Sequence, residues 1–106
     1  MFFHVILFNF YPEVSSDDIH KVFCDLGELQ NEIPQIASYH FGQNDSTNIN
    51  NKNFEYCFIM GFTSKTNRYI YQNHSAHQAF ISKRLKSIIK DFVVFDFDDQ
   101  VSKKNI

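Results

Sequence analysis

Three side chains that can exchange protons lie close together in the sequence. They are Tyr71, His74 and His77, spaced three residues apart in the segment Y-Q-N-H-S-A-H-Q-A-F, where a polar stretch turns into an amphipathic helix pattern. A histidine in the first turn of a helix tends to stay neutral, because the helix macrodipole disfavours a positive charge there. The pattern therefore makes His77 a candidate general base near neutral pH, with Tyr71 as a candidate hydrogen-bond donor beside it.

A base next to a phenol suits proton abstraction beside a carbonyl group or an intramolecular aldol condensation. The alternative is structural: His74 caps the helix, and His77 satisfies a buried hydrogen bond. A metal site is disfavoured, since the two histidines are three residues apart instead of four and no carboxylate lies between them. Nothing near His77 supports haem either, so we expect no metal and no cofactor.

The composition indicates one globular domain. The chain has 106 residues, of which 43% are hydrophobic, and it contains 13 Phe and no Trp, so we expect a core built largely from Phe rings. We predict a folded domain over residues 1–98 and a polar tail over 99–106 that frays. Asp96, Asp98 and Asp99 form an acidic cluster at the domain end, which fits either a hard cation or a solvated strand end.

The charge pattern disfavours nucleic acid and membrane partners. The net charge is -2 and the ten Lys and Arg residues are spread thinly, which leaves little basis for binding nucleic acid by counterion release. No apolar run approaches the length of about 18 residues that a transmembrane helix needs. Cys24 and Cys57 lie far apart in apolar segments and are expected to be reduced thiols, so the expected location is cytoplasmic.

The hydrophobic periodicity predicts strands and helices in a recognisable order. Ser15 is a suitable N-cap for a helix that Pro34 ends. The order of elements predicts a ferredoxin-like β-α-β-β-α-β fold of the α+β class, with a four-stranded antiparallel sheet and the helices on one face. The expected strands cover 2–10, 36–42, 54–62 and 92–97, and the expected helical segments cover 15–33, 65–71 and 75–89, with a polar loop over 43–53.

The first and last strands are apolar on both faces, yet the helices can cover only one face of the sheet. An apolar sheet face left open to water is either an aggregation hazard or an interface. We therefore predict a homodimer in which two sheets pack face to face and form a barrel-like core.

Four segments of the sequence resemble the stress-responsive dimeric α/β-barrel (Dabb) family. They are H-V-I-L-F-N-F at 4–10, E-I-P-Q-I at 32–36, Tyr71 with the following H-S-A-H-Q-A-F, and D-F-V-V-F-D-F at 91–97. The resemblance covers nearly the whole chain and implies a ferredoxin-like protomer that dimerises into a barrel. The family includes a plant polyketide cyclase, olivetolic acid cyclase.

The resemblance to that cyclase implies roles for three residues. A residue matching His77 acts there as the base, one matching Tyr71 assists by hydrogen bonding, and one matching His4 lines the pocket. Tyr56 stands near a position where many members carry a histidine, and a phenol there cannot act as a base at neutral pH. We expect His4, Tyr56 and His74 to contribute to ligand binding.

Two functions follow as expectations. The first is a stress-responsive barrel protein of undefined activity that binds a small apolar or aromatic molecule in the barrel. The second is a polyketide-cyclase-like or lyase enzyme with His77 as base and Tyr71 as donor. An enclosed space of about 300 Å³ or more beside His4, Tyr71 and His77 would favour ligand binding or catalysis, whereas a space filled by Phe rings, with His77 hydrogen-bonded to the backbone, would exclude an enzyme.

Overall fold

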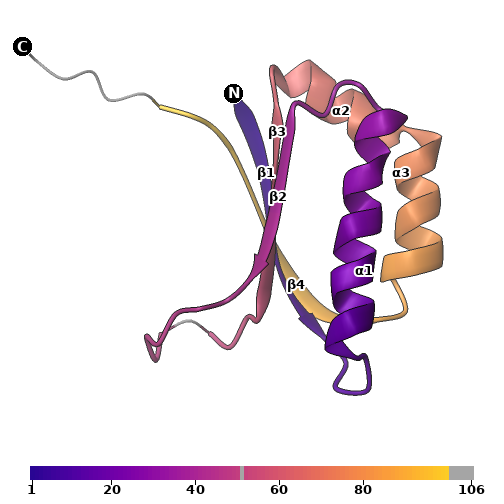
Figure 1. Cartoon of the computed structure of the whole chain (residues 1–106). Helices are drawn as coiled ribbons and strands as arrows, with labels where there is room; N and C mark the ends of the chain where they lie inside the picture. The colour runs from indigo at the N-terminus through magenta and orange to yellow at the C-terminus, as the bar shows by residue number, and fades with distance from the viewer. Residues whose placement is uncertain (51, 101–106) are drawn as a thin grey trace, which may run out of the picture.

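The fold is a single antiparallel sheet with its helices on one side, as the computed structural model of residues 1–50 and 52–100 shows (Figure 1). The strands lie in the order β2-β3-β1-β4. This arrangement confirms the predicted ferredoxin-like fold. The strands are β1 (Phe2–Phe10), β2 (Ser38–Gln43), β3 (Tyr56–Phe62) and β4 (Ile89–Asp98), and the helical segments are α1 (Ser16–Gly27), η1 (Glu28–Asn31), α2 (Lys65–Asn73), α3 (Ser75–Phe80) and η2 (Ile81–Leu85).

Helix α1 begins as the sequence predicts. The Ser15 hydroxyl accepts a hydrogen bond from the backbone N–H of Asp18 at 3.1 Å, which satisfies one of the free donors at the helix start. The helix buries one apolar stripe against the sheet, and it tightens into the 3₁₀ turn η1 before reaching Pro34. The buried residues of the stripe are Ile19, Val22, Phe23 and Leu26.

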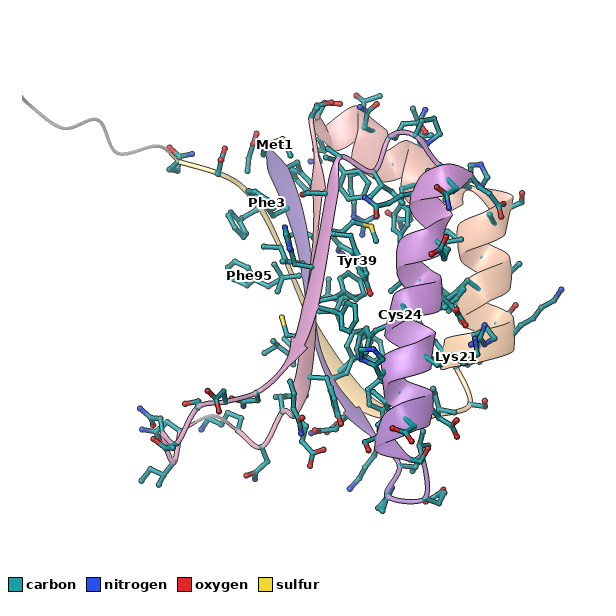
Figure 2. The ribbon with its side chains drawn as sticks, in the orientation of Figure 1. Met1, Phe3, Lys21, Cys24, Tyr39 and Phe95 are labelled. Atoms are coloured by element: carbon teal, nitrogen blue, oxygen red, sulfur yellow. The ribbon has the colours of Figure 1, made fainter. Side chains whose placement is uncertain are left out.

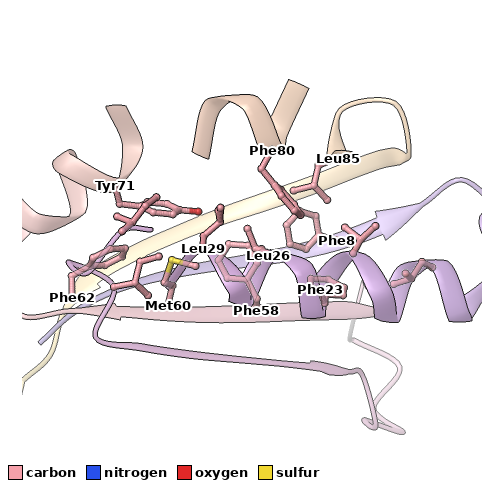
Figure 3. Packing of buried hydrophobic residues seen from close by; sticks show 14 of the residues in the cluster. Phe8, Phe23, Leu26, Leu29, Phe58, Met60, Phe62, Tyr71, Phe80 and Leu85 are labelled. Atoms are coloured by element: carbon pink, nitrogen blue, oxygen red, sulfur yellow. The ribbon is translucent and has the colours of Figure 1, made fainter. Parts of the chain in front are cut away.

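Phenylalanine rings join the helices to the sheet (Figure 3). Phe8 of β1 lies 5.7 Å from Phe23 of α1 and 5.6 Å from Phe58 of β3, measured between ring centroids. Each ring is at most 2% exposed. Aromatic pairs at this separation add to the free energy gained by burying their area, so the core is rigid beneath the helices.

The last helix differs from the prediction of a continuous helix over 75–89. It consists of the α-helical α3 and the π-helical turn η2, in which the N–H of Lys86 bonds to the carbonyl of Ile81 at 2.9 Å. Strand β4 then begins at Ile89, which pairs with Phe10 of β1. The apolar pair at residues 88 and 89 fits a helix or a strand equally well, and pairing with β1 decides between them.

The sheet face away from the helices is apolar. Figure 2 shows Phe3 and Phe95 on this side, whereas Tyr39 points towards the helices. Phe95 is 64% exposed. The pairing register places Val5 of β1 between Ile59 of β3 and Phe95 of β4, so the apolar surface crosses three neighbouring strands. We call this surface the open face; it comprises Phe3, Val5, Leu7, Cys57, Ile59, Val93, Phe95 and Phe97.

Two further predictions concern the polar tail of the chain and a membrane partner. Of the predicted polar tail over 99–106, residues 101–106 lie outside the described part of the chain. Within residues 1–50 and 52–100, none of the helices combines the length and the apolar character needed to cross a membrane.

Candidate functional site

A cavity of about 810 Å³ lies between the sheet and the helices. We call it the helix-side cavity. Its apolar lining comes from three strands and from the helical segments α1 and η2: Ile6, Phe8, Leu26, Phe58, Ile81, Leu85, Ile89 and Phe92. Its polar lining consists of His4, Arg68, Tyr71, Gln72, His77, Lys86, Lys90 and Asp91. The structure therefore brings three of the five predicted site residues, His4, Tyr71 and His77, to one hollow space.

Tyr71 and His77 form the closest aromatic pair of this cavity. Their ring centroids are 4.2 Å apart. The Nδ1 atom of His77 lies 3.2 Å from the backbone carbonyl of Gln72. Because a carbonyl oxygen only accepts, Nδ1 carries the proton of the neutral ring and Nε2 keeps its lone pair. His77 is thus held in the tautomer that a general base requires.

Burial lowers the pKa of His77 below its usual value. The hydrogen bond to the Gln72 carbonyl opposes this effect, and the nearby charge of Arg68 reinforces it. The imidazole is therefore neutral near pH 7, as the sequence predicts. Desolvation is the main cause of the lowered pKa. The helix macrodipole, the cause expected from the sequence, is weak in a helix of only six residues.

Tyr71 is a buried phenol that remains protonated. The residue is 1% exposed, and burial raises the pKa of its hydroxyl well above the usual range. The half-buried phenol Tyr39 donates a hydrogen bond to the carbonyl of Phe23 at 2.8 Å. No comparable bond to a residue within 1–50 or 52–100 engages the Tyr71 hydroxyl, so this group is available to donate a hydrogen bond to a ligand.

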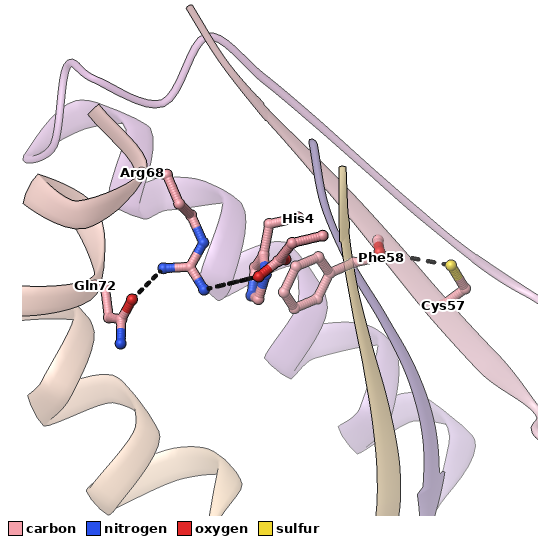
Figure 4. Close-up of polar contacts among 6 residues, drawn as sticks. His4, Cys57, Phe58, Arg68 and Gln72 are labelled. Atoms are coloured by element: carbon pink, nitrogen blue, oxygen red, sulfur yellow. Dashed lines mark hydrogen bonds and ion pairs between the residues drawn. The ribbon is translucent and has the colours of Figure 1, made fainter. Parts of the chain in front are cut away.

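Two of the polar lining residues, His4 and Arg68, form a cluster with Asp96 (Figure 4). Nδ1 of His4 lies 2.5 Å from Oδ1 of Asp96, the residue that pairs with His4 across β1 and β4. An Nη atom of Arg68 lies 3.3 Å from His4 Nδ1 and 3.7 Å from Asp96 Oδ2. Burial lowers the pKa of His4, against the raising effect of Asp96. Sequence reasoning missed Arg68 altogether, although it lies one helical turn before Tyr71.

The predicted acidic cluster does not stay together as a possible cation site. Asp96 turns towards His4 on the helix side of the sheet, and Asp99 accepts a hydrogen bond from the N-terminal amino group at 3.0 Å. Across residues 1–50 and 52–100, no three His, Cys, Asp or Glu side chains gather in a way that could hold a metal ion.

His74 and Tyr56 lie away from the helix-side cavity. His74 separates α2 from α3, and its Nδ1 accepts a hydrogen bond from the backbone N–H of Ala76 at 3.0 Å. It therefore acts as the N-cap that the structural alternative describes. Tyr56 packs its ring against Phe10 and Phe23 at centroid distances of 5.5 and 6.0 Å. Neither side chain lines the cavity, which departs from their expected contribution to the pocket.

Comparison with known proteins agrees with the fold. The model of the family described as the stress-responsive A/B barrel domain matches residues 2–99. No curated protein sequence matches the chain.

Three solved structures share its fold. A protein from Arabidopsis thaliana is 24% identical with a TM-score of 0.91, and the match covers 98% of this chain and 100% of that one. A hydroxynitrile lyase from Passiflora edulis is 16% identical with a TM-score of 0.85, covering 97% and 96%. A dimeric ferredoxin-like protein of unknown function from Thermobifida fusca is 23% identical with a TM-score of 0.74, covering 91% and 88%.

Proposed function

Because this chain belongs to the stress-responsive A/B barrel domain family, we propose that it is a homodimeric barrel protein that binds a small apolar or aromatic molecule in its helix-side cavity. The cavity itself is the observation that carries this proposal. Its volume of about 810 Å³ falls within the range of roughly 300–1,000 Å³ typical of small-molecule sites. Its lining has the expected character, a mostly apolar wall with a few polar groups.

The homodimer is supported by the open face. Several large apolar side chains there are exposed to solvent, among them Phe95 and Phe97. A second copy of the chain presents the same apolar surface, so two sheets packed face to face would remove both surfaces from water. The similar protein from Thermobifida fusca is described as dimeric, which agrees with this arrangement.

An acid–base enzyme is the second candidate function. The specific observation in its favour is the His77 tautomer, which leaves Nε2 unprotonated on a ring whose centroid lies 4.2 Å from that of Tyr71. One fitting reaction is that of a lyase, the activity named for the similar Passiflora edulis protein. His77 would take the hydroxyl proton of an aromatic hydroxynitrile, the carbonyl would form, and the carbon–carbon bond would break with its electron pair leaving on cyanide. A polyketide-cyclase-like aldol condensation would use the same base and donor.

Calorimetric titration with benzamide, naphthamide and decanamide tests the binding proposal. We expect saturable binding of at least one compound, and about tenfold weaker binding to Ile81→Trp, because Ile81 lines the cavity and its replacement fills it. The matched control is Ile70→Trp, whose site is also part-exposed but lies outside the cavity lining. Absence of saturable binding, or equal weakening in both variants, would contradict the proposal.

His77→Gln separates the two candidate functions. If the protein is a lyase, this variant should lose on the order of 100-fold or more in cleavage of an aromatic hydroxynitrile while it still binds the amides. Cleavage that is absent in the wild type, or unchanged in the variant, would leave ligand binding as the function.

A further inference from the structure

Arg68 is a buried cation whose hydrogen-bonding capacity is only partly used. Its side chain is 12% exposed. Nη1 donates to the side-chain oxygen of Gln72 at 2.9 Å. Nε is buried and has no hydrogen-bond partner. A buried charged donor without an acceptor costs free energy, so the guanidinium keeps hydrogen-bonding capacity that the fold does not use.

Asp96 does not form a short hydrogen bond with Arg68, because its carboxylate is bound to His4. The short contact from His4 Nδ1 to Asp96 Oδ1 places the imidazole proton on Nδ1, since a carboxylate only accepts. A protonated Nδ1 cannot accept from Arg68, so the 3.3 Å contact between them is not a hydrogen bond. The remaining pair, 3.7 Å from Arg68 Nη2 to Asp96 Oδ2, is longer than the roughly 2.7–2.9 Å of a charge-assisted hydrogen bond.

The charges around the helix-side cavity favour an anion. Arg68, Lys86 and Lys90 line it, whereas Asp91 is the one carboxylate among its lining residues. The two lining histidines have lowered pKa values, so they are uncharged near neutral pH and do not alter this balance of charges. A guanidinium presents a rigid fork of donors that matches the two oxygens of a carboxylate.

Neutral polar groups accompany Arg68 on the cavity wall, which is otherwise apolar apart from Lys86, Lys90 and Asp91. Arg68 and Tyr71 lie on successive turns of α2, with the guanidinium carbon 5.9 Å from the Tyr71 ring centroid. The free Tyr71 hydroxyl is a neutral donor on a ring next to the charged guanidinium. The opposite lining is formed by apolar side chains such as Phe92 and Leu85.

We propose that the helix-side cavity selects carboxylic acids with an apolar or aromatic body, and that Arg68 is the residue that recognises the carboxylate. This inference rests on the proposed function, because it names the class of molecule that the cavity takes.

Matched acid and amide pairs test the inference by calorimetric titration. The pairs are benzoate with benzamide, naphthoate with naphthamide, and decanoate with decanamide. In each pair an uncharged amide replaces the carboxylate, and the apolar body stays the same. In the wild type we expect the acid to bind about tenfold or more tightly than its amide. Arg68→Gln should weaken the acid far more than the amide and so remove this preference, and Arg68→Lys should retain part of it. Arg84→Gln is the matched control, because Arg84 pairs with Asp25 at 2.7 Å and does not line the cavity.

Asp96→Asn gives a test in the opposite direction. Removing this negative charge beside Arg68 should tighten acid binding severalfold and leave amide binding unchanged, whereas a merely structural Arg68–Asp96 pair predicts no gain for the acids. This variant and Arg68→Lys carry the test if Arg68→Gln fails to fold.

The two proposals fail in different ways. If acids and amides bind equally well to the wild type, or if Arg68→Gln weakens both equally, carboxylate selection is wrong while ligand binding stands. An Asp96→Asn variant without a gain for acids also counts against it. If neither acids nor amides bind, both proposals fail.

Discussion

Two neutral imidazoles, those of His4 and His77, line the same cavity as one permanent cation, Arg68. Burial is the largest cause of the lowered pKa of each ring, and the charge of Arg68 lowers both further. Near neutral pH the cavity therefore offers two lone pairs, one phenol proton and one guanidinium. This set of groups can hold a polar ligand end and can also accept a proton from it.

The lowered pKa values predict how stability depends on pH. A histidine with a folded-state pKa below its unfolded value of about 6.5 binds more protons when unfolded, so its contribution to stability is present above that pH and is lost as the pH falls towards the folded-state pKa. We expect the urea midpoint of the wild type to fall as the pH is lowered from about 7, and the fall to be shallower in His77→Gln. Urea unfolding at a series of pH values measures this. Identical pH profiles of the two proteins would show that burial does not shift the His77 pKa.

The sequence pointed to Tyr71 and His77 through their types and spacing and to His4 through a family resemblance, and the structure gathers these three at one cavity. Arg68 and Asp96 could not be found in the same way. Asp96 is 92 residues from His4 along the chain, and only the register of β1 against β4 brings them together. Arg68 had one local signal, its spacing of three residues from Tyr71 on a helix, which places both on one face.

The break between α2 and α3 creates the Tyr71–His77 pair. In a continuous α-helix, residues six apart point in directions that differ by about 120°, so the two rings could not meet. His74 adopts extended backbone angles, φ -69° and ψ 135°, and ends one helix while it caps the next. The chain changes direction at this residue, and the ring centroids come within 4.2 Å of each other.

The cap bond of His74 can be tested by substitution. His74→Ala should lower the free energy of unfolding by about 0.5–2 kcal/mol, because it leaves the N–H of Ala76 without its side-chain acceptor. His74→Asn keeps an acceptor suited to an N-cap and should recover most of the loss. Urea unfolding of the three proteins measures both changes. Equal stability of the alanine and asparagine variants would mean that the cap bond contributes little.

The first strand was easier to predict than the other strands and the end of the last helix. The limits of β1, residues 2–10, agree with the prediction, because a continuous apolar run and the Tyr11-Pro12 break mark them locally, whereas the predicted limits of β2, β3 and β4 differ from the observed ones by up to three residues. The end of the last helix depends instead on tertiary pairing, since Ile89 completes β4 opposite Phe10. A local apolar pattern cannot contain that information.

At the scale of the whole molecule, two copies are needed to complete the proposed barrel. The sheet has one face against the helices and one apolar face open, and the chain offers no further element among its described residues to cover it. The second copy would cover the open face, while each helix-side cavity stays within its own protomer.

Phe95→Lys tests the dimer. Phe95 is 64% exposed and contributes nothing to the core beneath the helices, so the variant should fold as a monomer. The control is Ile49→Lys in the loop after β2, where the isoleucine is 94% exposed and lies off the open face. We expect sedimentation equilibrium to show a dimer for the wild type and the control. A wild type that remains monomeric at high concentration would refute the face-to-face assembly.

The central claim is that the space beside Tyr71 and His77 is hollow and takes a small molecule. Following the NMR signals of the five imidazole rings during titration with naphthoate and naphthamide tests it most directly. The account predicts saturable shifts of the His77 and His4 signals, with those of the exposed His20 and His40 unchanged. Signals of His77 and His4 that stay fixed while the compounds bind, or that move no more than those of the exposed rings, would contradict it.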